Sequence, residues 1–447
     1  MKKTDLLIVG GSAAGLVVAM TARKHYPQSK ILIIREDKEG QLMVPCGIPY
    51  IFGTLGATKK NVVPDATLSQ NNIDLLVDKV SDIDRNSKIV TTSNGESLKY
   101  DKLALATGSI PISIPIPGIN LENVFFAKKD MDYLDEMLKV FGAVKDIAII
   151  GGGFIGLEFA DEFKKNNANV TLVEVLPHCL QLVFDEDYCL LADSKLEENG
   201  INVRTNAQAE AILGKDKVEG LQLAGGEIIK VDMVFLGVGV RPNTELAQKA
   251  DLRMGETRGI WTDEYGRTSD KDIFAAGDCA EKRSFFTNEP SPLKLASIAT
   301  QDARIVGANL FGLKRRNGGV IGSFSTVIGD MFLGQAGLTE KAAKEAGFDY
   351  IVGEVVTFDK HPGTLPGSKE MRIKLLFEAA SNEILGGQVC GGVTVGEITN
   401  IVSLLIQKRM RADEIVTLQS GTHPFSTPSP VSYPIINAAE AAVVQKN

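Results

Sequence analysis

The chain has 447 residues, a formal net charge of −8 at pH 7 and 44% hydrophobic residues. This length allows two or three domains and a large buried core. The mildly acidic balance, without a basic cluster, argues against a nucleic-acid surface. No apolar run approaches the roughly 18 residues that a membrane span needs, and the start of the chain lacks the apolar stretch of a signal peptide. We therefore expect a cytoplasmic globular protein without nucleic-acid or membrane partners.

Five cysteines stand at positions 46, 179, 189, 279 and 390, without Cys-x-x-Cys spacing. In a reducing compartment this pattern predicts thiols rather than a disulfide framework. No bound metal is expected.

The first elements form a strand, loop, helix and strand. Residues 5–10 are a continuous apolar run, typical of a buried parallel strand. A helix is predicted from Ser12 to about Lys24, and a second strand over 31–34. In such a unit the backbone N–H groups of the loop and the positive end of the helix can hold a pyrophosphate. The loop residues that we assign to this role are Gly10, Ser12, Ala13, Ala14 and Gly15.

The same pattern recurs later in the chain, which makes it an internal repeat. A strand over 147–150 leads into a loop over 151–156, a helix to about Asn166 and a strand over 170–173. The loop residues assigned here are Gly151, Gly153, Phe154, Ile155 and Gly156. Glu36 follows the second strand of the first unit, and Glu174 follows that of the second. An acid at this position can accept hydrogen bonds from a ribose diol, so the repeat predicts two dinucleotides.

The rest of the chain carries further strands, including 233–236 and 272–275. From about residue 322 onward, strands such as 373–377 alternate with helices such as 397–408, without a phosphate loop. This last region is therefore expected to be a domain of a different kind.

Three further features bear on the chemistry. One strand ends in Ala106-Thr107-Gly108, and another ends in Gly277-Asp278, where an aspartate can hold a flavin ribityl chain. Cys46 lies between two prolines, 10 residues after Glu36, at a predicted helix start. A helix N-terminus lowers the pKa of a thiol and favours the thiolate.

Together these motifs resemble those of the flavin-dependent pyridine nucleotide–disulfide reductases. More narrowly they resemble the single-cysteine branch of coenzyme A disulfide reductases, NADH oxidases, NADH peroxidases and NADH-dependent polysulfide or persulfide reductases. The resemblance covers essentially the whole chain. It implies an α/β fold with two Rossmann-like domains, for FAD and NAD, a C-terminal α+β dimerisation domain, and a homodimer. The expected boundaries are 1–117 and 251–322 for the FAD domain, 118–250 for the NAD domain and 323–447 for the dimerisation domain.

The resemblance also implies roles for residues. The first loop would bind FAD together with Glu36, Ala106, Thr107, Gly108, Gly277, Asp278 and Ala296. At the second loop, Phe154 would cover the flavin ring until the nicotinamide displaces it, and Glu158 would contact the carboxamide. Gly239 would belong to a second backbone wall. Glu174 carries a negative charge where a 2′-phosphate would sit, which favours NADH over NADPH.

Cys46 has no second cysteine five residues away. Its oxidised form would therefore be a mixed disulfide, a persulfide or a sulfenic acid. The expected reaction is reduction of a small disulfide, persulfide or polysulfide, such as coenzyme A disulfide, with electrons from NADH through FAD. One alternative is an NADH oxidase that reduces oxygen at the flavin, with Cys46 as sulfenic acid. Another is a flavoprotein that donates electrons to a protein partner.

Positions that differ within the branch narrow the choice. Ala13 stands where peroxidases and many water-forming oxidases carry a histidine, which argues against a dedicated peroxidase. Leu365 and Gly421 align with tyrosines of coenzyme A disulfide reductases, so that assignment is also weakened. His423, followed by Pro424, resembles the acid–base histidine that two-cysteine reductases present across the dimer interface. A structural, hydrogen-bonded histidine is the other interpretation. His361 is expected in a surface loop.

Overall fold

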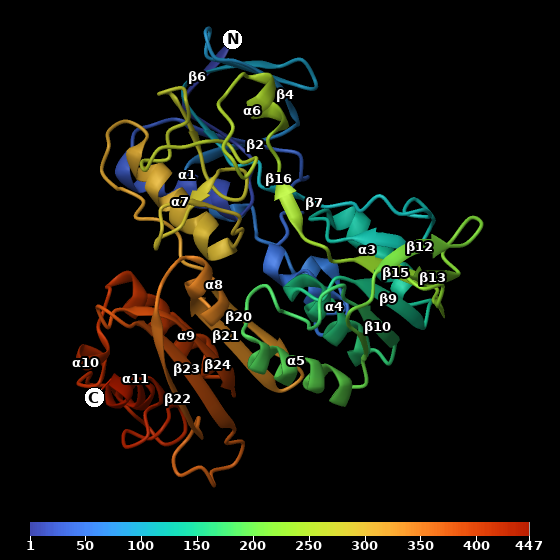
Figure 1. Cartoon of the computed structure of the whole chain (residues 1–447). Coiled ribbons are helices and arrows are strands. Elements are labelled where there is room, and N and C mark those ends of the chain that lie inside the picture. Colours follow the sequence, from blue (N-terminus) through green and yellow to red (C-terminus); the bar gives the residue numbers. More distant parts are fainter. Residues whose placement is uncertain (447) are drawn as a thin grey trace. The chain divides into compact units, whose positions relative to one another are not determined.

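The structure is a computed structural model that describes residues 1–446. The chain forms two compact units, each built from three stretches of sequence (Figure 1). The first unit contains Met1–Ile114, Phe126–Ala143 and Gly239–Val320. The second contains Pro115–Phe125, Val144–Val238 and the chain from Ile321 on.

The first unit is built on a sheet with the strand order β3-β2-β1-β6-β5-β4, with β17 beside β6. Its strands are β1 (Lys2–Val9), β2 (Ile31–Arg35), β3 (Ile73–Val77), β4 (Val80–Asp84), β5 (Ile89–Thr92), β6 (Ser97–Leu105) and β17 (Ile273–Ala275). Strands β3, β2, β1 and β6 are parallel. Leu6 and Ile8 pack into the core on one face, and Leu7 and Val9 into the core on the other. This two-sided burial explains the continuous apolar run in the sequence.

Helices α1 (Ala13–His25) and α7 (Ala296–Asn309) pack against each other in this unit. Its other elements are η1 (Pro45–Gly47), η2 (Pro49–Ile51), η3 (Thr58–Lys60), α2 (Ala66–Ser69), α3 (Met131–Phe141), α6 (Glu245–Lys249), the pair β7 (Ser109–Pro111) and β16 (Val240–Pro242), and the pair β18 (Lys282–Arg283) and β19 (Pro290–Ser291).

The second unit begins with a five-stranded sheet of order β11-β10-β9-β15-β8. Its strands are β8 (Val124–Phe126), β9 (Asp146–Ile150), β10 (Asn169–Val173), β11 (Asn202–Arg204) and β15 (Met233–Leu236). Helix α4 (Phe154–Lys165) follows β9 and packs on β9 and β10, and α5 (Glu186–Glu198) packs on β11. A small antiparallel sheet contains β12 (Ala209–Leu213), β13 (Gly220–Leu223) and β14 (Ile228–Lys230).

The last region of this unit is an antiparallel sheet of order β20-β21-β24-β23-β22. Its strands are β20 (Ser323–Ile328), β21 (Met331–Gly337), β22 (Tyr350–Phe358), β23 (Glu370–Glu378) and β24 (Ile384–Gly391). Its helices are α8 (Glu340–Glu345), α9 (Val395–Gln407), α10 (Ala412–Ile415) and α11 (Pro434–Lys446). Helix α9 packs on β20, β21 and β24, and α11 packs on β22 and β23. The predicted α/β fold class, with two Rossmann-like units and a C-terminal α+β region, is confirmed.

Two local predictions differ from the structure. The second loop is shorter than expected, because α4 already begins at Phe154. Gly156 lies inside this helix. Glycine is needed there because the backbone of Gly151 packs closely against it, not because the residue is in a loop. The helix predicted at Cys46 is a single 3₁₀ turn, Pro45–Gly47. Pro49 has no N–H to donate to the carbonyl of Pro45, so an α-helix cannot form across this segment.

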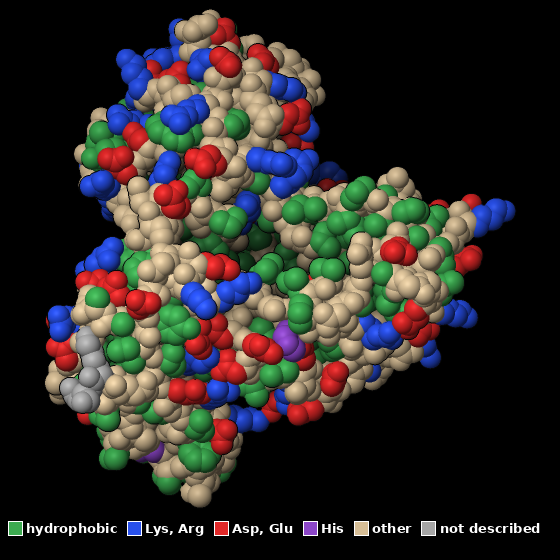
Figure 2. Space-filling view, viewed as in Figure 1, with side chains coloured by type: hydrophobic (Ala, Val, Ile, Leu, Met, Phe, Trp, Pro, Cys, Tyr) green, Lys and Arg blue, Asp and Glu red, His purple; other side chains and the backbone are tan. Residues whose placement is uncertain are grey.

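Among the described residues, no helix is both long and apolar enough to cross a membrane. Lys, Arg, Asp and Glu side chains are interspersed over the face of the molecule shown in Figure 2.

Candidate active site

The first glycine-rich loop borders a cavity of about 450 Å³ in the first unit. Six of the predicted residues line this cavity: Gly10, Ser12, Glu36, Ala106, Thr107 and Gly108. Gly10 has a φ of +104°, and a Cβ added there would lie 2.2 Å from the carbonyl oxygen of Ala106. Only glycine permits this arrangement, which leaves the loop backbone open to a pyrophosphate.

Glu36 stands at the edge of this cavity with its side chain 68% exposed. Its Oε2 lies 3.7 Å from Nζ of Lys79, which also lines the cavity. An ion pair this exposed contributes little, so the carboxylate can still accept hydrogen bonds from ribose hydroxyls. Lys79 was not predicted, because an exposed lysine carries no signal in the sequence.

Arg35 is a second cavity residue that the sequence analysis missed. It is buried and forms a 2.7 Å ion pair with Asp65, which also accepts a hydrogen bond from the N–H of Gly40 at 2.7 Å. Its Nη1 has no hydrogen-bond partner within the described part of the chain. A buried donor without a partner, at a cavity with a glycine cradle, fits a ligand rich in acceptor atoms such as a dinucleotide.

The Gly277-Asp278 turn is held by a buried ion pair. Nζ of Lys282 lies 2.6 Å from Oδ2 of Asp302, and the two side chains are 3% and 8% exposed. Lys282 donates to the carbonyl of Gly277 at 2.6 Å, and Asp302 accepts from its N–H at 3.3 Å. The pair therefore holds the peptide groups before and after Gly277, whose φ is +80°. The next residue, Asp278, accepts a 2.7 Å hydrogen bond from Ser109.

The remaining residues assigned to FAD do not line the cavity. Ala13, Ala14 and Gly15 form the first turn of α1, and Ala296 is the first residue of α7. A Cβ on Gly277 would lie 2.8 Å from Cβ of Ala14, so the aspartate turn abuts the start of α1. These residues, the cavity and the partnerless arginine nitrogen together fit a bound FAD.

Cys46 is exposed, whereas the other four cysteines are buried. Its neighbourhood is held by the buried side chain of Asn61, which donates to the carbonyl of Val44 at 2.9 Å. A Cβ on Gly47 would lie 1.9 Å from Oδ1 of Asn61, so the turn depends on glycine here. One 3₁₀ turn carries only a small dipole, so stabilisation of a thiolate by a helix N-terminus loses its support.

The second loop repeats the geometry of the first. Gly151 has a φ of +108°, and a Cβ on Gly152 would lie 3.0 Å from Oε2 of Glu174. Glu174 is buried and accepts hydrogen bonds from the N–H groups of Gly152 at 2.5 Å and Leu176 at 2.8 Å. This carboxylate therefore holds the loop itself, a role that the sequence analysis did not assign to it. Ile155 follows in the first turn of α4.

Phe154 and Glu158 both contact β20 of the last region. The ring of Phe154 stacks on that of Phe324, with centroids 5.3 Å apart and planes at 22°. Glu158 accepts a 3.1 Å hydrogen bond from Oγ1 of Thr326. Burial raises the pKa of Glu158 to about 7, even though the Thr326 hydrogen bond lowers it. The sequence analysis missed Phe324 and Thr326, because they lie more than 150 residues away from their partners.

The other predicted residues lie apart from these clusters. Gly239 is exposed with a φ of +99°, and its carbonyl accepts from Ile112 at 3.0 Å. His423 is exposed, and its Nδ1 accepts from the N–H of Phe425 at 3.3 Å. His361 is half-buried and contacts the same loop, because its N–H donates to the carbonyl of Pro424 at 3.1 Å. Within residues 1–446, no group of three or more possible ligands could hold a metal ion.

Comparison with known proteins identifies the family. Residues 4–303 match the family described as pyridine nucleotide-disulphide oxidoreductase, and residues 323–432 match its dimerisation domain. An NADH oxidase of Methanocaldococcus jannaschii is 33% identical over 454 residues, which cover 98% of each chain. An NAD(P)H coenzyme A polysulfide/persulfide reductase of Pyrococcus horikoshii is 31% identical over 440 residues, which cover 97% of each chain.

Among solved structures, an NAD-dependent persulfide reductase from A. fulgidus has a TM-score of 0.92 at 31% identity, covering 99% of this chain and 83% of that one. The chain therefore belongs to the pyridine nucleotide-disulphide oxidoreductase family. It is a flavin-dependent NAD(P)H oxidoreductase with FAD and NAD domains, and its dimerisation domain fits a homodimer.

The buried ion pair of Lys282 and Asp302 leads to a first prediction. Lys282→Met should weaken FAD binding about tenfold or more, because the carbonyl of Gly277 loses a charged donor. It should also lower the free energy of unfolding by about 3 kcal/mol, because Asp302 stays buried without its partner. FAD affinity of the apoprotein, measured by flavin fluorescence, and denaturant unfolding check the two effects.

Two variants serve as controls for this test. The double change Lys282→Met and Asp302→Leu should recover part of the stability but not the FAD affinity. Lys102→Met removes one of the two lysines that pair with Asp272, outside the Gly277-Asp278 turn, and should leave FAD affinity unchanged. Wild-type FAD affinity in the single Lys282 variant would show that the hydrogen bond from Lys282 to Gly277 does not support FAD binding.

The raised pKa of Glu158 predicts a dependence of stability on pH. The folded chain keeps a proton on Glu158 up to about pH 7, whereas the unfolded chain releases it near its ordinary value of 4.5. The contribution of Glu158 to stability therefore falls as the pH rises from about 4.5 to 7. Glu158→Gln removes this titration. The stability of the variant minus that of wild type should therefore be larger at pH 8 than at pH 5. Urea unfolding at both pH values tests this, and a pH-independent difference would refute it.

Proposed function

We propose that this chain is an NADH-dependent FAD enzyme that reduces a small disulfide, persulfide or polysulfide, such as coenzyme A disulfide, through Cys46. The observation that carries this proposal is the exposure of Cys46 while the other four cysteines are buried. A thiolate can attack a sulfur substrate only where the substrate reaches it. Two relatives named as persulfide reductases, each 31% identical, support a sulfur substrate.

FAD would be held by the first loop, Glu36, the Ala106–Gly108 strand end and the Gly277-Asp278 turn, with Ala296 beside it. When bound, it would supply a two-electron relay between the nicotinamide and Cys46. The proposed domain boundaries follow this assignment: 1–117 and 251–322 for FAD, 118–250 for NAD and 323–447 for the dimerisation domain.

The nicotinamide nucleotide would lie on the second loop, from Gly151 to Gly156, with Gly239 as a second backbone wall. Glu158 would contact the carboxamide, and Phe154 would cover the flavin position until the nicotinamide displaces it. We propose NADH rather than NADPH, because the buried carboxylate of Glu174 would repel a 2′-phosphate. Support comes from its fixed orientation, with both oxygens bonded to backbone N–H groups.

At Cys46 the proposed chemistry is thiol–disulfide exchange. The thiolate attacks one sulfur of the substrate disulfide, a mixed disulfide forms, and the second half leaves as a thiolate that takes up a proton. Two electrons and one proton from NADH then cleave the mixed disulfide, which regenerates the Cys46 thiolate and releases the second thiol. The overall reaction consumes one NADH and one proton for two thiols formed.

His423 is the proposed acid–base group, acting on Cys46 of the partner subunit in the homodimer. Its Nδ1 accepts from the N–H of Phe425, so the proton of the neutral ring is on Nε2. An exposed Nε2–H can donate to a leaving thiolate.

The NADH oxidase alternative keeps a specific observation in its favour, which is the 33% identity to an NADH oxidase. In that case Cys46 would cycle through a sulfenic acid with oxygen as the acceptor. Mass spectrometry of the non-reduced protein separates the two functions: a coenzyme A or sulfur adduct on Cys46 supports the sulfur substrate, and a sulfenic acid supports the oxidase.

Cys46→Ser should lower disulfide turnover to background, because serine cannot form the mixed disulfide. Flavin reduction by NADH in a stopped-flow instrument should remain at the wild-type rate. Cys189→Ser is the matched control, since the serine hydroxyl can keep the contact of Sγ with the carbonyl of Phe184 at 3.6 Å. Disulfide turnover at the wild-type level in the Cys46 variant would refute the proposed mechanism.

His423→Ala should slow the thiol half-reaction by about 10²-fold, because a positioned acid–base group contributes that much or more. The pH–rate profile of this half-reaction should lose the limb that reports the histidine, and flavin reduction by NADH should not change. His25→Ala, in the first unit, serves as the control. A wild-type pH profile in the His423 variant would make His423 a structural residue.

A further inference from the structure

Two residues of helix α4 contact two residues of strand β20. Phe154 and Glu158 are four residues apart on α4, so they share one face of the helix. Phe324 and Thr326 are two residues apart on β20, so they share one side of the strand. The ring of Phe154 stacks on that of Phe324, and Glu158 accepts the hydrogen bond from Thr326. The helix that begins at the second phosphate loop is thus docked on a strand of the dimerisation domain.

A third ring completes the surroundings of Phe154. Phe184 meets Phe154 edge-on, with centroids 6.3 Å apart and planes at 68°. Phe154 therefore has a stacked partner on one strand and an edge-on partner in the segment before α5. Stacked and edge-on arrangements are the favourable geometries of aromatic pairs, so both contacts stabilise the observed position of the Phe154 ring.

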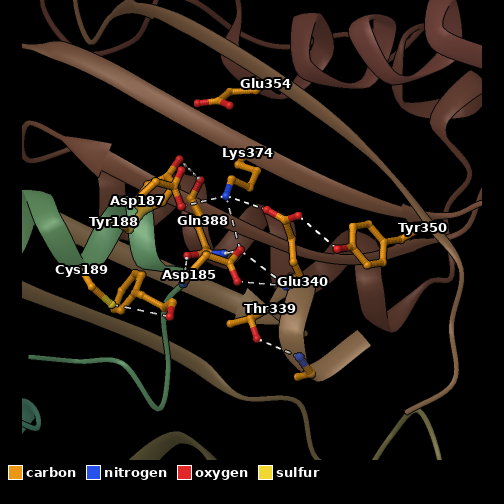
Figure 3. A network of polar contacts seen from close by, with 12 residues as sticks. Asp185, Asp187, Tyr188, Cys189, Thr339, Glu340, Tyr350, Glu354, Lys374 and Gln388 are labelled. Carbon is orange, nitrogen blue, oxygen red and sulfur yellow. Dashed lines mark hydrogen bonds and ion pairs between the residues drawn. The ribbon is translucent and has the colours of Figure 1, made fainter. Parts of the chain in front are cut away.

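The segment that carries Phe184 is fixed by a polar network (Figure 3). Its next residue, Asp185, donates its N–H to Oε1 of Gln388 at 2.8 Å, and the amide of Gln388 donates back to its carboxylate. The ammonium of Lys374, 5% exposed, lies 2.9 Å from Asp187 and 2.8 Å from Glu340, and 3.4 Å from Asp185. These contacts tie the start of α5 to strands β23 and β24, next to Phe184.

We propose that Phe324 is a positioning residue for Phe154, and that binding of the nicotinamide has to take Phe154 out of its stack on Phe324. This inference rests on the proposed function, in which the nicotinamide displaces the Phe154 ring. An aromatic pair is worth about a two- to tenfold change in an equilibrium constant beyond its burial. The stack would oppose nucleotide binding by this factor, because the energy of the pair is lost when the ring leaves.

The experiment measures the affinity of NAD⁺ for the oxidised holoenzyme by calorimetry. Phe324→Ala should bind NAD⁺ about two- to tenfold more tightly than wild type. Phe324→Tyr keeps a stacking ring and should bind NAD⁺ as wild type does. In a Phe154→Ala background, the Phe324→Ala change should have no further effect, since the pair is already absent. If Phe324 had only a structural role, the effect of Phe324→Ala on NAD⁺ affinity would not depend on whether Phe154 is present.

Unchanged or weaker NAD⁺ binding in the Phe324→Ala variant overturns the inference, and so does an equal effect of this change with and without Phe154. If Phe324→Ala does not fold, Phe324→Leu is used with the same expected direction, because leucine fills the space without a ring. The proposed function fails separately: wild-type holoenzyme that does not bind NAD⁺, or whose flavin NADH does not reduce, refutes the function regardless of the variants.

Discussion

In both Rossmann-like folds the helix starts almost in contact with the strand before it. A Cβ on Gly15 would lie 1.9 Å from the carbonyl oxygen of Gly10, and a Cβ on Gly156 would lie 1.9 Å from that of Gly151. No side chain fits between these backbones, so glycine is required at both places. This approach aims the loop N–H groups and the helix dipole at the same point, where a pyrophosphate would sit. The cavity beside Glu36 and the position of Phe154 both follow from it.

Around this shared framework, charges hold the backbone rather than the ligand. Lys282 and Asp302 hold the carbonyl and the N–H of Gly277, and Glu174 holds the second loop through Gly152. Each of these groups is buried and hydrogen-bonded, as buried charges must be. A rigid turn presents its oxygens and N–H groups without paying the entropy of ordering them when the cofactor binds. The loops therefore combine open backbone with little freedom to move.

Within the second unit, the dimerisation domain also contacts helix α4, which follows the second glycine-rich loop. Strand β20 supplies Phe324 and Thr326 to the helix that carries Phe154 and Glu158. Burial raises the pKa of Glu158 to about 7, although the hydrogen bond from Thr326 lowers it, so the charge of Glu158 responds to pH in the neutral range. Under the proposed function, the residues that would contact the nicotinamide nucleotide therefore also pack on the last domain.

The sequence by itself determined the fold class, the two phosphate loops and the unusual position of Cys46. These features depend on local patterns: apolar strands, glycines where a Cβ would clash, and an acid after the second strand. The resemblance to the pyridine nucleotide–disulfide reductases was confirmed, and so were the elements around both loops, apart from the shorter second loop. The helix predicted at Cys46 is instead a 3₁₀ turn, because Pro49 has no N–H to donate to the carbonyl of Pro45.

Only the tertiary structure decided which distant side chains meet these motifs. Lys282 and Asp302, Arg35 and Asp65, and Phe154 and Phe324 are ordinary residues in the sequence, and each pair is separated by 20 or more positions. A pattern with the period of a helix or strand reports which face a residue occupies, but not what packs on that face. The partners are set by how sheets and helices assemble, and this assembly turns an open loop into a site with fixed geometry.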